Sequence, residues 1–484
     1  MPERECELRS IAWGEVFPFL RLFRTFRLAI SPGRILTALA AVALVCLVGW
    51  VMDRIWVGAG HGALIDPATG QSEVAAYASM GSKDFALWQE HVKEMHEPAA
   101  AGNFASLLRY EMRCFAAAVR GVMTLRWGFS APAWDPQPSF LGSIVSAGQG
   151  VQWLVTQRPL FFIIYAILHF AIFALFGGAI CRSAVVEVAR DESISPTNAL
   201  RFAGQKFGGL ALGPALPAGI FAGILIVFIV VSFLGLIPWL GELLAGILFW
   251  LALAAGFALA MILIGTVLGL HLTWPTIAAE GSDGFDAVSH AFAYVTQRPW
   301  YTAFYSALLL LYGAVCFVMV RLIALVTLKL THACTNWGMS FFGAVSSART
   351  DTVSKLDAMW HMPAWSDLTF LPTSGGVPFW GTFFAAPLDW SESIGAALIA
   401  FWVFIVVGLV GAFVVSFFFC GSTQMYLLLR RNVDAVDYDE IYYEEPEPKL
   451  PAAAPGAAEP STPGPTSQPA ADETSAGSEP GGGA

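Results

Sequence analysis

Residues 208–270 read GGLALGPALPAGIFAGILIVFIVVSFLGLIPWLGELLAGILFWLALAAGFALAMILIGTVLGL, and their only ionisable residue is Glu242. About 20 apolar residues in a helix span the hydrocarbon core of a bilayer, so this stretch is long enough to cross it twice. Pro238 and Gly241 favour the end of one helix and the start of the next. The stretch therefore predicts a transmembrane helical hairpin.

The composition of the whole chain also indicates a protein that lies in a membrane. The chain is 56% hydrophobic and only 13% charged, whereas about a quarter of the residues in an ordinary soluble domain are charged. The formal net charge of −10 comes largely from acids in the C-terminal tail and the predicted outer loops. No basic stripe with interleaved aromatic residues indicates nucleic-acid binding. The predicted partners are the lipid bilayer and other membrane proteins, with no nucleic acid.

Hydropathy predicts an all-α polytopic membrane helix bundle. Its membrane domain, residues 35–433, has about six transmembrane helices, predicted at residues 35–52, 159–181, 209–234, 240–270, 301–326 and 394–420. Residues 1–34, a basic amphipathic segment, carry six Arg and no Lys. Because basic residues favour the cytoplasmic side, we expect a cell (inner) membrane protein with both termini in the cytoplasm. Residues 53–158 and 327–393 are then outer loops.

Two further segments have the pattern of interfacial amphipathic helices. Within residues 17–30, Arg21, Arg24 and Arg27 recur on one side of a helix, and large apolar residues occupy the other side. This segment is interpreted either as a lipid-sensing anchor or, the preferred interpretation, as a basic flank that orients the first span. Residues 104–127 repeat the pattern, and we expect them to lie on the outer leaflet or to cap the bundle.

The C-terminal tail, residues 434–484, changes character twice. Residues 434–445 hold six acids and three tyrosines, which is typical of a solvated linker, with a docking site for a partner as the alternative. Residues 446–484 are rich in Pro, Ala, Gly and Ser and lack aromatic side chains. Because such a segment buries little apolar surface, it is predicted to be disordered.

One five-residue phrase, VTQRP, occurs at residues 155–159 and again at 295–299. Each copy ends an amphipathic stretch and opens a predicted span, where Pro fits the first helical turn. Three spans separate the copies, so the predicted topology places them on opposite faces of the membrane. Two interpretations follow: an inverted repeat, as in transporters, or, the preferred one, reuse of a favourable helix-entry phrase.

The second copy lies in a phrase that carries a family resemblance. PTIAAE (275–280), FDAVSHAFAY (285–294) and Arg298-Pro299 resemble poorly characterised bacterial membrane domains, some of which are fused to glycerophosphodiester phosphodiesterases. The chain as a whole resembles a planctomycete-type family of multi-pass membrane proteins. The first resemblance covers about sixty residues and implies a lipid-related role. No phosphodiesterase catalytic domain follows, so no activity is carried over.

Four residues are candidates for an intramembrane polar site: His169, Arg321, Glu242 and His271. Ionisable groups in spans mark functional sites by default, and His169 is the strongest because it falls in the middle of a predicted span. The simpler interpretation is a histidine hydrogen-bonded between helices. The four residues are not expected to converge at one depth. No nucleotide, nucleophile or metal motif is found, so no catalytic residue, cofactor or metal is predicted.

The leading functional hypothesis is therefore a non-enzymatic membrane protein, an organiser or subunit of a membrane complex. The alternative is a solute transporter or channel, based on His169 and the VTQRP repeat. A lipid-processing membrane protein is a third hypothesis, based on the family resemblance alone.

Overall fold

The computed structural model describes residues 17–94, 99–343, 355–368 and 390–442. The predicted disordered tail, residues 446–484, lies outside the described residues, and so does Tyr443 of the acidic stretch. The described residues belong to one compact unit, and everything below concerns that unit.

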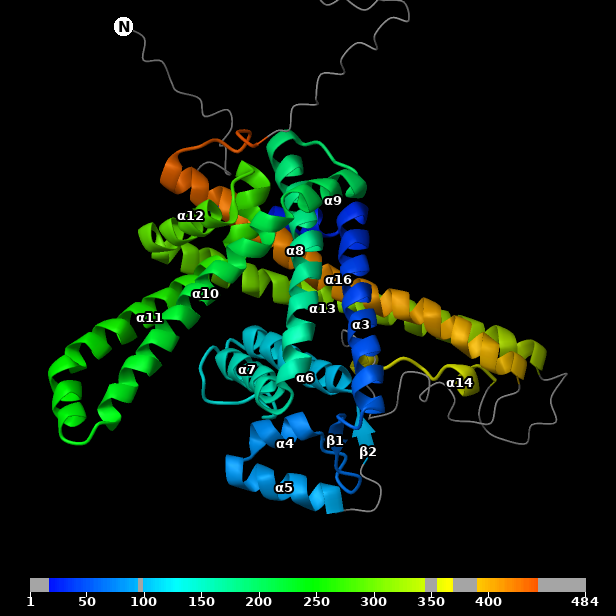
Figure 1. Cartoon of the computed structure of the whole chain (residues 1–484). Coiled ribbons are helices and arrows are strands. Elements are labelled where there is room, and N and C mark those ends of the chain that lie inside the picture. The colour runs from blue at the N-terminus through cyan, green and yellow to red at the C-terminus, as the bar shows by residue number, and fades with distance from the viewer. Residues whose placement is uncertain (1–16, 95–98, 344–354, 369–389, 443–484) are drawn as a thin grey trace, which may run out of the picture. The chain divides into compact units, whose positions relative to one another are not determined.

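The described elements follow one another along the chain as helices with a single small sheet (Figure 1). They are η1 (Pro18–Arg24), α2 (Thr25–Ala29), α3 (Pro32–Gly58), β1 (Ala63–Ile65), α4 (Glu73–Ser79), α5 (Ser82–Glu94), β2 (Ala99–Ala101), α6 (Asn103–Met123), α7 (Phe140–Gln157), α8 (Pro159–Arg190), α9 (Pro196–Gln205), α10 (Phe207–Ser232), η2 (Phe233–Leu236), α11 (Leu240–Glu280), α12 (Gly284–Gln297), α13 (Pro299–Gly343), α14 (Lys355–Met359), η3 (Trp365–Leu368) and α16 (Trp390–Asp434).

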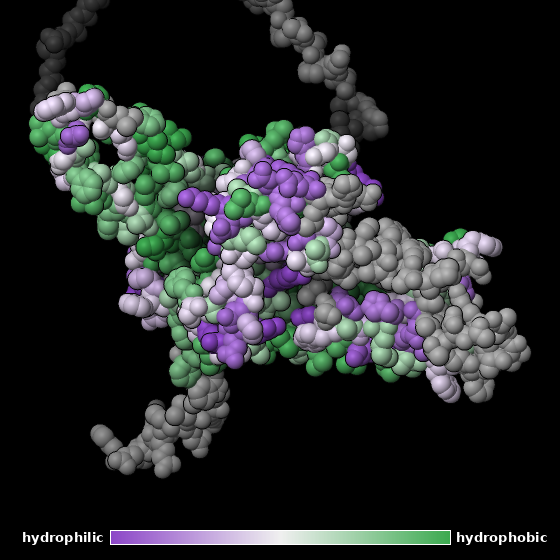
Figure 2. All heavy atoms as spheres, turned by 90° about the horizontal axis from the view of Figure 1, so that it is seen from below, coloured by the Kyte–Doolittle hydropathy of each residue, from purple (hydrophilic) through white to green (hydrophobic). Residues whose placement is uncertain are grey.

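Six of the described helices are long and apolar enough to cross a membrane: α3, α8, α10, α11, α13 and α16. The predicted all-α polytopic bundle is therefore confirmed, and the chain is a multi-pass membrane protein. The only sheet in the described residues pairs three-residue strands, β1 and β2, in antiparallel register. Figure 2 shows hydrophobic residues gathered on one side of the view and hydrophilic residues at its centre.

Most of these helices run well beyond the apolar segments that hydropathy marks. Helices α13 and α16 each contain 45 residues, about 68 Å at 1.5 Å per residue, against roughly 30 Å of hydrocarbon. Hydropathy marks the apolar segment that lies in lipid, whereas the helix itself continues until a residue caps its end. Helix α8 ends only where Asp191 turns left-handed, and α11 ends at left-handed Gly281. Residues 182–190 and 271–280, expected in loops, are therefore helical.

The predicted hairpin is present as α10 and α11, which pack side by side (Figure 1). The helical path breaks after η2, and Trp239 adopts a positive φ of 68° before α11 begins. Pro238 lacks the N–H that would continue a helix, which is the reason the break falls there.

Segment 53–158 is mostly helical and packs against the spans. Helix α6, the amphipathic helix expected near residues 104–127, packs on α3, α7 and α13. The Phe115 and Phe317 rings meet edge to face with centroids 5.3 Å apart. Of the two expected positions, the structure favours a cap on the bundle.

Polar side chains join the C-terminal ends of α11 and α16 to α12. Glu280 accepts a hydrogen bond from the Tyr426 hydroxyl, forms an ion pair with Arg430 at 3.4 Å, and lies 3.0 Å from His290 Nδ1. Glu280 and His290 belong to the PTIAAE and FDAVSHAFAY phrases, so within this fold these residues tie helices together.

The start of the acidic tail is part of this cluster. The Tyr442 N–H donates to the Ala279 carbonyl at 2.7 Å, and Arg182 donates to the Tyr442 carbonyl at 2.9 Å. The Arg21 guanidinium lies 4.0 Å from the centre of the Tyr438 ring. Backbone hydrogen bonds and cation–π contacts therefore hold residues 435–442 against the bundle, although most of these residues are exposed.

The N-terminal segment is divided into η1 and α2, and part of its apolar side packs on the bundle. Leu22 and Leu28 are buried, while Phe23 and Ile30 remain exposed. Because the first turns are 3₁₀ and not α, the residues that share a side differ from those of a regular α-helix.

The two VTQRP copies have the same local structure. Arg158 ends α7 with φ −140° and ψ 57°, and Arg298 ends α12 with φ −132° and ψ 55°. In each copy the following Pro begins a long helix. The phrase therefore specifies a tight junction between an amphipathic helix and a span.

Candidate functional site

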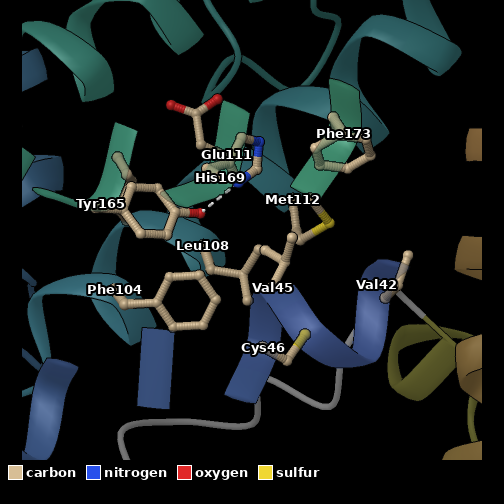
Figure 3. Close-up of a pocket in the computed structure, with 11 residues that line it drawn as sticks. Val42, Val45, Cys46, Phe104, Leu108, Glu111, Met112, Tyr165, His169 and Phe173 are labelled. Carbon is tan, nitrogen blue, oxygen red and sulfur yellow. Dashed lines mark hydrogen bonds between the residues drawn. The ribbon is translucent and has the colours of Figure 1, made fainter. Parts of the chain in front are cut away.

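A pocket with a volume of about 280 Å³ lies between α3, α6 and α8 (Figure 3). Its lining is mostly apolar and is contributed by Val42, Val45, Cys46, Phe104, Leu107, Leu108, Glu111, Met112, Tyr165, His169 and Phe173. Two of the three helices are membrane spans, and His169 is the residue that the sequence singled out as the best intramembrane candidate.

Helix α8 contributes a column of rings to the pocket. Tyr165, His169 and Phe173 are spaced four residues apart, so they share one face of the helix. The Tyr165 hydroxyl lies 3.1 Å from His169 Nδ1, a hydrogen bond drawn in Figure 3. The His169 and Phe173 ring centroids are 4.8 Å apart. His169 therefore has a partner on its own helix, and its ring is held between two aromatic neighbours.

Helix α6 forms the opposite wall, and α3 fixes where that helix begins. The Asp53 carboxylate accepts the backbone N–H groups of Phe104 and Ala105, with N···O distances of 2.8 and 3.0 Å. It acts as an N-cap supplied by a different helix. Gly49 allows the Phe104 ring to lie against α3, since a Cβ there would be 2.4 Å from the ring. These contacts place the first turns of α6 beside the pocket.

Glu111 is the only charged residue in the lining. Its Oε1 atom is buried and accepts no hydrogen bond from the described residues. A Cβ built on Gly150 of α7 would lie 2.5 Å from that oxygen, so α7 closes tightly over it. Burial raises the pKa of Glu111 to about 7, because removal from water disfavours the carboxylate. The side chain therefore changes charge near neutral pH.

The side chains of the pocket are suited to binding a ligand, and they include one carboxyl group, that of Glu111. Aromatic and aliphatic side chains supply an apolar enclosure, and Glu111, His169 and Tyr165 supply polar contacts. Cys46 is the only Ser, Cys or Lys side chain in the lining, and within the described residues its thiol has no hydrogen bond to a base of the kind that activates a nucleophile.

The other predicted candidates do not join His169. Arg321 on α13 is 7% exposed, and its guanidinium lies 4.2 Å from the centre of the Trp365 ring. Glu242 is exposed in the first turn of α11, and His271 is half-buried further along the same helix. None of the three lines the pocket.

Sequence reasoning missed Glu111, although the pattern of α6 contains a signal for it. Leu107, Leu108 and Phe115 mark the apolar face of α6, and Glu111 is four residues from the first and last of these. Positions separated by four residues lie on one face of a helix. An acid on the apolar face of an amphipathic helix is a buried carboxyl candidate.

Within the residues that the structure describes, no cluster of three metal-ligating side chains is found. The fold and the pocket define a multi-pass membrane protein with an apolar, carboxyl-bearing cavity between its helices. Comparison of the chain with protein-family models, with curated proteins and with solved structures finds no match.

Proposed function

We propose that this protein is an organising subunit of a complex in the cell (inner) membrane, with both termini in the cytoplasm. The observation that carries the proposal is the surface of the α10–α11 hairpin. Large apolar side chains on both helices are exposed, among them Val227 at 62%, Trp250 at 66% and Phe257 at 69%. Contacts to α8 and α12 come from the ends of the hairpin near Leu210 and Leu272, which are fully buried.

Glycines on the hairpin distinguish a partner surface from a purely lipid-facing one. A Cβ on Gly265 would meet the Phe292 ring of α12, so this glycine serves packing within the chain. Gly219, Gly223 and Gly256 have open space where a Cβ would be. Small residues at such positions allow a second transmembrane helix to approach closely. This contrast supports a partner helix on α10 and α11.

Enlarging these glycines is expected to release the partner. Gly223→Leu and Gly256→Leu should reduce the mass of the complex in native electrophoresis of mild-detergent extracts to that of the 52.0 kDa chain with its micelle. Val227→Leu, a change of similar character at an exposed position of the same hairpin, should leave the mass unchanged. Wild-type mass in both glycine variants, or a wild-type protein that migrates as a single chain, would refute the organiser proposal.

The proposed orientation has its own test. A reporter that is active only in the cytoplasm should be active when fused after Ala484 and inactive when fused to a chain truncated after Gly102, because the basic flanks favour the cytoplasmic side. Gly102 directly precedes α6 and follows the first span, α3. Activity of the Gly102 fusion would contradict the orientation and leave the six helices unaffected.

A second candidate function is a solute transporter or channel, and the pocket around His169 favours it. The supporting observation is a cavity between two spans that contains a titratable carboxyl group. A lipid-processing role rests on the family resemblance alone, and the comparisons add no support to it.

A further inference from the structure

The Tyr165 hydroxyl and the His169 imidazole leave one hydrogen-bond donor unused. A phenol and a neutral imidazole together carry two donor hydrogens, one O–H and one N–H. Their mutual contact, with the hydroxyl 3.1 Å from Nδ1, uses one of the two, whichever tautomer the imidazole adopts. Neither side chain has another hydrogen-bond partner among the described residues. One O–H or N–H group of the pair is therefore free to donate to a ligand.

This donor borders the pocket between α3, α6 and α8. In Figure 3 the Tyr165 hydroxyl and the His169 ring meet at the edge of the space between the labelled side chains. Apart from Glu111, the other lining side chains are aliphatic, aromatic or sulfur-containing. An unpaired donor in apolar surroundings is costly, so an acceptor oxygen placed beside the pair lowers the free energy.

The lining offers no opposite charge to a charged ligand. It contains neither Lys nor Arg, and its one acid, Glu111, directs its carboxyl group away from the rings in Figure 3. A Cβ on Gly150 would lie 2.5 Å from Glu111 Oε1, so this oxygen faces α7, which contributes nothing to the lining. An ion in the pocket would lose its hydration without compensation. The ligand that fits is therefore uncharged.

The place of the pocket in the fold selects for a lipid-soluble ligand. Residues 42–46 of α3 and 165–173 of α8 contribute to the lining, and both helices are long and apolar enough to span the membrane. Apolar segments of spans lie at the level of the hydrocarbon core. A compound that reaches these side chains must therefore dissolve in hydrocarbon.

The volume and the aromatic side chains favour a compact ring. A volume of about 280 Å³ lies just below the range of about 300–1,000 Å³ for drug-sized ligands. One substituted ring fills it, and a longer chain on that ring must extend beyond it. The Phe104 and Tyr165 rings, with centroids 5.6 Å apart, form an aromatic wall against which such a ring packs.

We propose that this pocket binds a compact, uncharged ring compound that carries a carbonyl oxygen, the chemical class of the lipid-soluble quinones. The carbonyl oxygen accepts the unused donor of the Tyr165–His169 pair, and the ring packs against Phe104 and Phe173. A carbonyl suits this site because it is an acceptor that brings no donor of its own to be left unpaired. The assignment concerns binding and contains no electron-transfer step. It does not depend on the α10–α11 hairpin or on a partner protein.

Duroquinone and durene are a matched pair of probes, because both are single rings with the same methyl groups and only duroquinone has carbonyl oxygens. Binding to the full chain in lipid nanodiscs is measured by equilibrium dialysis against protein-free nanodiscs, and affinities refer to the probe dissolved in the lipid. We expect the wild type to bind duroquinone about fivefold more tightly than durene, as one hydrogen bond allows. Equal affinity for the two probes, or no binding of duroquinone beyond that of protein-free nanodiscs, would overturn the proposal.

Variants of the donor pair test its role. Tyr165→Phe or His169→Leu alone leaves one donor, so each should keep a preference for duroquinone. The double variant Tyr165→Phe/His169→Leu has no donor left and should bind both probes equally, with durene bound as in the wild type, which shows that the pocket is intact. Tyr77→Phe/His91→Leu removes the same groups from α4 and α5, outside the lining, and should behave like the wild type. A double pocket variant that keeps the wild-type preference would contradict the role of the pair.

A change of volume at Val45 tests where the probes bind. Val45 of α3 lines the pocket, so Val45→Phe fills space that a ring would occupy and should weaken binding of both probes several-fold. Val45→Ile, a smaller enlargement, should show the same effect to a lesser degree. Leu44→Phe, at the neighbouring exposed position of α3, should leave both affinities unchanged. Wild-type affinities in both well-folded Val45 variants, as judged by size exclusion, would place the probes elsewhere and refute the assignment.

Discussion

Replacing Arg34 by Met is expected to lower the free energy of unfolding by about 2–4 kcal/mol, since it removes charge-assisted hydrogen bonds and leaves half-buried Glu187 without its opposite charge. Arg34 is only 2% exposed. Its Nε donates to the Leu28 carbonyl at 2.6 Å, and its Nη2 forms an ion pair with Glu187 at 2.9 Å. The same side chain reaches Ser183 through Nη1 at 3.2 Å. One guanidinium thus ties the N-terminal segment and α3 to the end of α8.

The matched control is Arg27→Met, at an exposed position of α2, which should change stability little. The double variant Arg34→Met/Glu187→Met should be more stable than Arg34→Met alone, because removal of both charges leaves no uncompensated carboxylate. Unfolding in mixed micelles, followed by circular dichroism, gives the three values. If Arg34→Met and Arg27→Met unfold alike, the buried ion pair has no role in stability.

Gly102→Ala is expected to cost about 2–4 kcal/mol, the sum of a steric clash and the loss of a helix cap. A Cβ on Gly102 would lie 2.0 Å from Asp53 Oδ2 and 2.3 Å from its Cγ. The carboxylate must then move, and the N–H groups of Phe104 and Ala105 lose their acceptor. Because this cap positions the first turn of α6, the wall of the pocket shifts with it.

Gly58→Ala provides the control, since a Cβ on this last residue of α3 has nothing within 4 Å. Its stability should equal or slightly exceed that of the wild type, because Ala favours a helix over Gly. Thermal unfolding of both variants in the same detergent tests the difference. Equal melting temperatures would show that the Gly102 and Asp53 contact is not rigid.

The membrane fold could be predicted from composition and hydropathy alone. The bilayer acts on each apolar segment separately, so a span is recognisable without knowledge of its neighbours. The hairpin break at Pro238 is equally local, because it follows from the missing N–H of one residue. His169 was a candidate for the same reason: an imidazole in the middle of a span is conspicuous in the sequence.

Tertiary structure decided the features that join distant residues. The fixed segment 435–442 depends on Arg182 and Ala279, which belong to other helices. The cap from Asp53 to α6 joins residues 51 and 52 positions apart. Glu111 became a site residue only because α3, α7 and α8 enclose it. Burial of a polar group depends on which helices pack together, and a single sequence does not encode that pairing in any local pattern.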